Sequence, residues 1–313
     1  MPATPSRREL LLATAAFTAT AAAAPAAESK PAAFGQCLNT STVRNAEGKS
    51  RPLVELIDIA SRAGFRAIEP WVSEIDDYVK AGGTLPDLAK RFADAGLAVP
   101  DAIGFAEWVV EDPARRKKGL EQAKRDMDTV QCVGGTRIAA PPVGATGGKP
   151  TEPVIDLLAA ADRYRDLWEL GRTMGVTPLV EVWGFSRTLK RLGETLLVAA
   201  ESGVSGAAVL PDIYHLYKGG SDFAGLSLLA PAAIGIFHVN DYPAIERGKI
   251  GDADRVYPGD GVAPLVAVLK SLRAIGYAGY LSVELFNRGY WKLDPHAVAK
   301  TAFEKLQAVI AKV

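Results

Sequence analysis

Short apolar runs alternate with longer amphipathic stretches eight times between residue 34 and the end of the chain. The amphipathic stretches repeat their apolar positions every three or four residues, which is the spacing of helices. One of them, residues 52–64, has Pro52 in its first turn and Gly64 just past its end, as helices often do. The apolar runs predict strands at residues 34–38, 65–70, 98–103, 136–140, 177–183, 207–212, 234–239 and 280–286.

Eight strand–helix units over about 280 residues give roughly 35 residues per unit, the length that a (β/α)8 TIM barrel requires. A doubly wound open sheet is the main alternative. That fold usually has a glycine-rich phosphate loop after its first strand, and residues 34–43 (FGQCLNTSTV) contain none. We therefore interpret residues 28–313 as a single TIM barrel.

The first 27 residues have a different pattern. Arg7 and Arg8 precede an uncharged run from Leu10 to Ala24, which is followed by small residues. This order predicts a twin-arginine signal peptide that is removed on export, and it implies the export machinery as a partner. The uncharged run is shorter than the roughly 20 residues that cross a bilayer, so we expect no stable membrane anchor. The mature protein is predicted to be periplasmic or otherwise exported.

Charge and cysteine content narrow the classes of partner. The chain has 36 Lys and Arg residues against 36 Asp and Glu residues, and none of them form a basic stripe. This balance argues against binding to nucleic acid or to an anionic membrane, and it favours a small uncharged or weakly charged partner. Cys37 and Cys132 fall at opposite ends of their βα units, so we expect two buried free thiols rather than a disulfide.

Polar residues close four consecutive predicted strands, where TIM barrels have their active sites. Strands five to eight end in Glu181, Asp212, His238 and Glu284. Unrelated buried polar residues are the alternative explanation. However, three carboxylates that converge on one barrel mouth repel one another unless protons or a cation compensate. The pattern therefore predicts a divalent metal site.

Further motifs accompany these four residues. His215 follows Asp212 by three positions (DIYH), His238 begins HVND, and Arg255 begins R-x-Y-P-G-D-G. Together they resemble the xylose isomerase-like barrel family, in particular its sugar isomerase/epimerase branch typified by ketose 3-epimerases. The resemblance covers nearly all of the chain after the signal and is strongest in the second half.

The resemblance implies one divalent cation bound by Glu181, Asp212, His238 and Glu284. It also implies that His215 and Arg255 contact the substrate, although Arg187, Arg247 or Lys249 could replace Arg255 because the loop before it is long. Barrels of this branch often pair, so a homo-oligomer is an expectation.

The ligand set of three carboxylates and one imidazole suits Mn²⁺, with Mg²⁺, Co²⁺ or Zn²⁺ as alternatives. A cation chelated by a substrate carbonyl and a neighbouring hydroxyl acidifies the C–H between them and stabilises an enediolate. Glu181 and Glu284 could then remove and return the proton. The expected reaction is the isomerisation or epimerisation of a carbohydrate, for which no phosphate-binding cluster is evident.

Several other residues have two interpretations. Glu69 could be a substrate-binding carboxylate of the pocket or a paired structural one. Trp183, like Trp71, Trp108 and Trp291, could form a wall against a sugar ring or pack in the core. Asp241 is expected to orient His238, since metal-bound imidazoles usually have such a partner.

Three other functions compete with the isomerase. A keto-inositol-type dehydratase of the same superfamily would use the same two glutamates. A non-catalytic exported sugar-binding barrel would have little reason to keep them. A DNA-repair endonuclease of the same barrel type would need several metal ions, and the chain has only three histidines and no basic groove.

Overall fold

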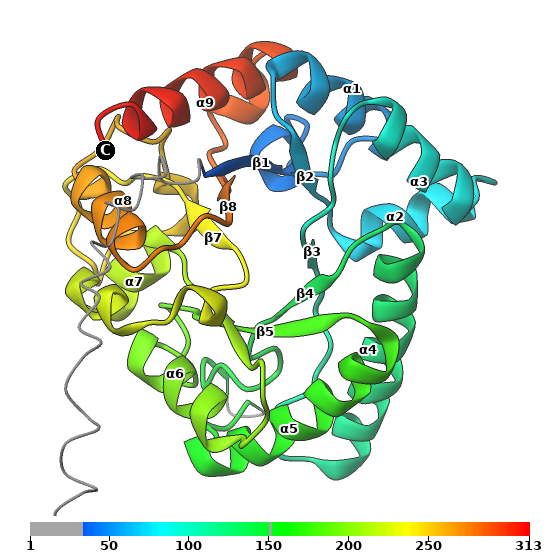
Figure 1. Cartoon of the computed structure of the whole chain (residues 1–313), viewed down its shortest axis with the longest axis vertical. Helices are drawn as coiled ribbons and strands as arrows, with labels where there is room; N and C mark the ends of the chain where they lie inside the picture. Colours follow the sequence, from blue (N-terminus) through cyan, green and yellow to red (C-terminus); the bar gives the residue numbers. More distant parts are fainter. Residues whose placement is uncertain (1–33, 150–151) are drawn as a thin grey trace, which may run out of the picture. The chain divides into compact units, whose positions relative to one another are not determined.

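The structure is a computed structural model that describes residues 34–149 and 152–313. The predicted signal peptide, residues 1–27, lies outside the described residues. Within the described part, eight parallel strands form a closed ring (Figure 1). They are β1 (Gly35–Asn39), β2 (Ala67–Glu69), β3 (Ala102–Ile103), β4 (Arg137–Ala140), β5 (Thr177–Glu181), β6 (Ala208–Leu210), β7 (Phe237–Val239) and β8 (Tyr280–Val283).

The ring consists of two parallel arcs joined by single bridges. One arc has the order β2-β1-β8-β7 and the other β3-β4-β5-β6. Parallel bridges from Ala67 to Ala98 and from Trp71 to Ile103 join β2 to the β3 segment, and a bridge from Asp212 to His238 joins the β6 and β7 segments. The predicted single TIM barrel is therefore confirmed.

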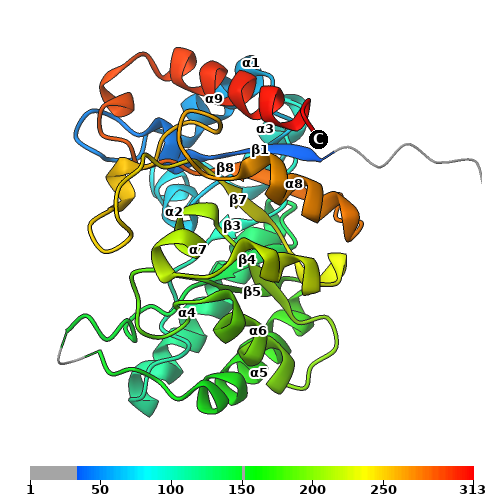
Figure 2. The ribbon, with the colours of Figure 1, turned by 90° about the vertical axis from the view of Figure 1, so that its left-hand side faces the viewer.

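Helices cover the outside of the ring, as Figures 1 and 2 show. Among the described residues, the helices are all too short or too polar to span a lipid bilayer. They are α1 (Leu53–Ala63), α2 (Val72–Lys80), α3 (Leu85–Asp94), α4 (Pro113–Cys132), α5 (Leu157–Met174), α6 (Leu192–Glu201), α7 (Ile213–Gly219), α8 (Leu265–Ala274) and α9 (Pro295–Ile310).

Two local expectations differ from the structure. The apolar spacing of residues 152–175 predicts a helix that starts at residue 152, but α5 starts only after Asp156, whose side chain accepts hydrogen bonds from the backbone N–H groups of Leu158 and Ala159. Cys37 is a buried free thiol as expected, but Cys132 is exposed, because it ends α4 on the outer surface.

Side chains alternate between the inside and the outside of the ring along each strand. A small apolar cluster fills the inside, and a larger one lies between strands and helices. Five of these inner apolar residues are followed two positions later by a polar residue, and these polar residues form a layer at the carboxyl ends of the strands. The inner apolar residues are Cys37, Ala67, Ile103, Ala139, Leu179, Ala208, Leu210 and Ile236.

A buried aspartate on α4 gives a stability prediction. Asp126 is 6% exposed, and burial together with the nearby Asp76 raises its pKa from 3.8 to about 6. The folded state therefore carries the cost of a buried charge above pH 6, and that cost disappears as the pH falls toward 4. We expect Asp126→Asn to raise the free energy of unfolding by about 1–3 kcal/mol at pH 7.5 and by much less at pH 4.

Urea unfolding at the two pH values measures this effect. Asp128→Asn, an exposed change of the same type on the same helix, is the control and should have little effect at either pH. A stabilisation by Asp126→Asn that is equal at both pH values would contradict the argument.

Candidate active site

A cavity of about 190 Å³ opens at the carboxyl ends of the strands. Its polar lining comes from the segments after β5 to β8, where the sequence predicted a site. The remaining lining is mostly aromatic. The lining residues are Trp71, Ile103, Phe105, Glu181, Trp183, Phe185, His215, Asp252, Arg255, Glu284 and Phe286.

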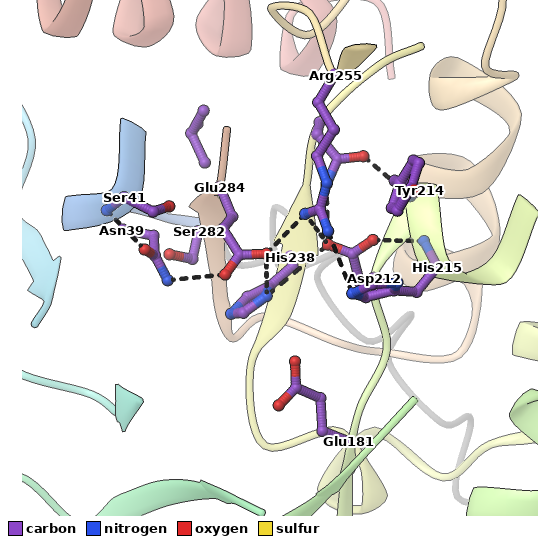
Figure 3. A network of polar contacts seen from close by, with 12 residues as sticks. Asn39, Ser41, Glu181, Asp212, Tyr214, His215, His238, Arg255, Ser282 and Glu284 are labelled. Carbon is purple, nitrogen blue, oxygen red and sulfur yellow. Dashed lines mark hydrogen bonds and ion pairs between the residues drawn. The ribbon is translucent and has the colours of Figure 1, made fainter. Parts of the chain in front are cut away.

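Three buried side chains bring their ligand atoms together beside this cavity (Figure 3). One ligand atom each from Asp212, His238 and Glu284 lies within 4.8 Å of the other two. His238 Nδ1 lies 3.2 Å from Glu284 Oε2 and 3.8 Å from Asp212 Oδ2, but it has no hydrogen-bond partner among the described residues. An unpaired buried nitrogen that faces two carboxylates fits a divalent cation well, both in charge and in donor type.

The other ring nitrogen of His238 is held by Glu69. Its Nε2 lies 2.9 Å from Glu69 Oε1, and both side chains are fully buried. Glu69 does not line the cavity, so the structure places it behind His238 rather than in the predicted substrate-binding position. Because this contact leaves Nδ1 directed at Asp212 and Glu284, Glu69 fixes the orientation that a metal ligand would need.

Asp241 was expected to orient His238, and this was wrong. Its carboxylate accepts four backbone N–H groups, from Tyr242, Gly259, Gly261 and Ala263, at 2.8–3.0 Å. It therefore holds the Pro-Gly-Asp-Gly turn closed. The close packing explains the glycine at position 261, because a Cβ atom there would lie 2.2 Å from the carbonyl oxygen of Tyr242.

Arg255 places a buried positive charge next to two of the candidate ligands. Its side chain is 1% exposed, and its Nη1 donates to Asp212 Oδ2 at 3.1 Å and to Glu284 Oε2 at 2.7 Å. Its Nη2 donates to Asp252 Oδ1 at 2.7 Å. The structure thus brings Arg255 into the site, whereas the alternatives Arg187, Arg247 and Lys249 do not line the cavity.

Both ring nitrogens of His215 face hydrogen-bond donors. Its Nδ1 lies 3.2 Å from the Gly184 backbone N–H, and its Nε2 lies 3.1 Å from Arg255 Nη2, which can only donate a hydrogen bond. Burial, together with the charge of Arg255, lowers the pKa of His215 well below its usual value, which keeps the ring neutral. His215 lines the cavity next to Arg255, and its Nε2 contacts the Arg255 guanidinium.

Glu181 lies apart from the three candidate ligands, with its carboxyl group pointing toward them (Figure 3). Its Oε1 accepts a hydrogen bond from Trp183 Nε1 at 3.0 Å. The structure therefore groups three of the four predicted metal ligands and places the fourth in the same cavity.

The two cavity glutamates have opposite pKa shifts. Burial raises the pKa of Glu181 to about 8, and the charges of Glu284 and Asp212 add to this against the opposing effect of His238. Burial alone would also raise the pKa of Glu284. The positive charges of His238 and Arg255 outweigh it and hold the Glu284 pKa below its usual value. At neutral pH, Glu181 is thus largely protonated and Glu284 ionised, which is the pattern of an acid and a base that share one site.

Asn39 is a site residue that the sequence did not reveal. Its Nδ2 donates to Glu69 Oε2 at 2.7 Å and to Glu284 Oε1 at 3.4 Å, so one amide connects both carboxylates. Its Oδ1 accepts from the Ser41 backbone N–H and from Trp71 Nε1. The predicted first strand ended one residue before Asn39. One more residue of strand would have placed this side chain in the same inner layer.

The four tryptophans that the sequence analysis named as possible cavity walls divide into two pairs. Trp71 and Trp183 line the cavity. Trp108 and Trp291 are buried and donate their indole N–H groups to the backbone carbonyls of Pro141 and Ser41. Only the first pair can contact a molecule in the cavity.

The pattern of the xylose isomerase-like TIM barrel family matches residues 57–309 of the chain. The chain belongs to this family. The match covers all of the predicted site residues, from Glu69 to Glu284. The predicted twin-arginine signal lies before the matched region and stays a prediction.

Relatives within the xylose isomerase-like family have several activities. An inosose isomerase of Bacillus velezensis is 25% identical over 278 residues, which cover 88% of this chain and 97% of that protein. An L-ribulose 3-epimerase of Mesorhizobium japonicum is 27% identical over 247 residues, 77% of each protein. A 3-dehydroshikimate dehydratase of Pseudomonas aeruginosa is 24% identical over 249 residues, which cover 77% of this chain and 37% of that protein.

A solved structure of the same barrel type agrees in fold. The crystal structure of the IolI protein with a bound zinc atom matches with a TM-score of 0.80 at 24% identity, over 89% of this chain and 99% of that one. This likeness supports the barrel architecture of the described residues.

The contacts of Asn39 lead to a prediction. Asn39→Ala would leave the buried carboxylates of Glu69 and Glu284 without an amide donor, which costs about 1–3 kcal/mol. Asn39→Asp would instead place a third carboxylate beside them. We therefore expect both variants to lower the free energy of unfolding at pH 8, and Asn39→Asp to lower it more.

Urea unfolding at pH 8 and pH 5 tests this order. The gap between the two variants should narrow at pH 5, where the added carboxyl can take up a proton. If Asn39→Asp is as stable as the wild type at pH 8, the amide does not connect the two carboxylates as described.

Proposed function

We propose that the protein is a divalent-metal-dependent isomerase or epimerase that moves a proton next to the carbonyl group of a sugar or cyclic keto-sugar. The observation that carries this proposal is the pair Glu181 and Glu284. Both line one cavity, and their surroundings shift their pKa values in opposite directions. A purely structural or binding site gains nothing from such a pair.

Asp212, His238 and Glu284 would hold the metal ion. Glu181, which the sequence motif implies as a fourth ligand, would act in its protonated form as the proton donor and would not bind the ion in that form. A bound divalent ion would polarise the carbonyl and hydroxyl oxygens of the substrate and so make the C–H bond between them more acidic. Glu69 serves this arrangement by keeping the Nδ1 atom of His238 directed at the two carboxylates.

Proton transfer is the task of the two cavity glutamates. Ionised Glu284 accepts the proton from the carbon beside the carbonyl, and protonated Glu181 returns one. Return to the other face of the same carbon gives an epimer, and return to the neighbouring carbon gives an aldose–ketose isomer. His215 and Arg255, which contact each other at the cavity wall, would bind substrate oxygens and hold the polyol in place during the transfer.

The relatives support this class of reaction and add a second candidate. The inosose isomerase and the L-ribulose 3-epimerase are named for isomerisation and epimerisation. The 3-dehydroshikimate dehydratase favours dehydration as the alternative. Dehydration would begin with the same proton removal and differ only in the loss of water, so the products decide between the two.

Metal binding should depend on pH through His238. Burial lowers the pKa of its imidazole, but the charges of Glu69 and Glu284 outweigh this and raise it well above the usual value. The ring therefore carries a proton on Nδ1 at neutral pH, and that proton must leave before a metal can bind. We expect the affinity for Mn²⁺ to rise by up to about tenfold per pH unit between pH 6 and pH 8.

Calorimetric titration of the metal-free protein with Mn²⁺ at pH 6, 7 and 8 measures this. His238→Ala should lose most of the affinity, whereas His296→Ala, on the outer face of α9, should retain it. Absence of uptake of Mn²⁺ or Zn²⁺ by the wild type at any of these pH values would refute the proposed function.

Glu181→Gln tests the chemistry. The amide cannot exchange a proton, so we expect the rate of deuterium incorporation from D₂O into inosose or L-ribulose to fall by about 10²–10⁴-fold. Glu201→Gln, an exposed change at the end of α6, is the control. Proton NMR of the recovered sugar shows whether deuterium entered an unchanged carbon skeleton or whether water was lost. Equal exchange rates in wild type and Glu181→Gln would remove Glu181 from the mechanism.

A further inference from the structure

A continuous band of aromatic rings lines part of the cavity. We call it the aromatic band, and it consists of Phe286, Trp71, Phe105, Trp183 and Phe185. Along this order the ring centroids are 6.3, 4.9, 6.4 and 5.0 Å apart, so each ring contacts the next. The rings follow β8, β2, β3 and β5, so residues distant in sequence build one surface. Such a surface suits the C–H-rich face of a ring-shaped molecule.

A cation supports the band from outside the cavity. The guanidinium carbon of Arg44 lies 4.2 Å from the centroid of the Trp71 ring and 5.7 Å from that of Phe286. Arg44 is not among the cavity-lining residues. Its charge therefore fixes the aromatic rings and does not meet a molecule inside.

Among the described residues, the cavity lining has no Lys or Arg side chain that is free of carboxylate partners and so able to bind an anion. Arg255 is the one Lys or Arg residue among the lining side chains described by the structure. Its guanidinium already contacts three carboxylates, those of Asp212, Asp252 and Glu284. Even with a divalent ion bound, the combined positive charge of that ion and Arg255 would not exceed the combined negative charge of the carboxylates of Glu69, Asp212, Asp252 and Glu284.

We propose that the cavity selects an uncharged ring ketone, whose C–H face lies on the aromatic band, and disfavours ring ketones that carry a carboxylate or a phosphate. The ketone in this statement rests on the proposed function, whereas the preference for an uncharged ring rests on the band and on the carboxylates around Arg255. The preference separates the substrates named for the relatives, because inosose is an uncharged ring and 3-dehydroshikimate carries a carboxylate.

Asp252 offers a way to change this preference without touching the candidate metal ligands. Its carboxylate is 43% exposed and contacts Arg255 Nη2 at the cavity wall. Asp252→Asn removes one of the three negative charges that compensate Arg255. The positive charge of the Arg255 guanidinium is then less fully compensated, so it can attract an anionic ligand.

Calorimetric titration of the Mn²⁺-loaded full chain with inosose and with 3-dehydroshikimate tests the proposal. We expect the wild type to bind inosose at least tenfold more tightly. Asp252→Asn should reduce this ratio at least threefold, mainly through tighter binding of 3-dehydroshikimate. Glu246→Gln makes the same charge change on an exposed part of the same loop and should leave the ratio within twofold of the wild-type value.

The aromatic band is tested separately by Phe105→Leu, which keeps an apolar side chain and removes the ring. Affinity for inosose should fall by about three- to tenfold. Equal or tighter binding of 3-dehydroshikimate by the wild type, an unchanged ratio in Asp252→Asn, or no binding of either ring would overturn the proposal. Failure of the proposed function would instead show as bound inosose that exchanges no deuterium with solvent.

Discussion

The site depends on the two-residue repeat of side chains along the barrel strands. In a closed ring only alternate residues point inward, so each strand contributes inner residues in layers. The inner apolar residues Leu179, Leu210 and Ile236 are each followed two positions later by Glu181, Asp212 or His238. Registration between neighbouring strands then sets these polar residues side by side, as the bridge between Asp212 and His238 shows. A slip of one residue in any strand would turn its functional side chain outward.

Such a buried polar layer is stable only because each charged side chain in it lies next to a side chain of opposite charge. His238 contacts Glu69 on one ring nitrogen and faces Glu284 with the other, while Arg255 joins Glu284 to Asp212. Removal of one partner from such a buried set leaves the other uncompensated, which costs far more than the pair contributes. The same matching sets the protonation states, because the charges around Glu284 keep it ionised whereas Glu181, with fewer positive neighbours, keeps its proton.

The sequence was most informative where chemistry and strand position coincide. Glu181, Asp212, His238 and Glu284 could be found because each interrupts or closes an apolar run, and such interruptions are rare in barrel strands. Asn39 carries no charge and lies just past a predicted strand end, so it gave no comparable signal. Phe105 and Phe286 lie in loops, where one-dimensional periodicity does not tell whether an aromatic ring faces a cavity or the core. Their place in the aromatic band follows from the closure of the ring, which brings β8, β2, β3 and β5 around one opening.

Nearness in sequence also misled the interpretation of Asp241. It lies three residues after His238, so a direct contact was a reasonable hypothesis, but the partner of His238 is Glu69, 169 residues away. Asp241 supports the site by a longer route. Its carboxylate accepts hydrogen bonds from the amides of the turn at residues 258–261, and its backbone pairs with Val256. Both contacts fix the end of the long loop next to Arg255.

The burial of Arg255 needs an explanation of its own. An arginine on a long loop is ordinarily exposed to solvent, because desolvation of a guanidinium is expensive. Arg255 can be buried for two reasons. The pairing of Asp241 with Val256 fixes the backbone next to it, and three carboxylates compensate the charge of its guanidinium. The loop thus places the Arg255 guanidinium between Asp212 and Glu284, where it offsets the repulsion between their two carboxylates.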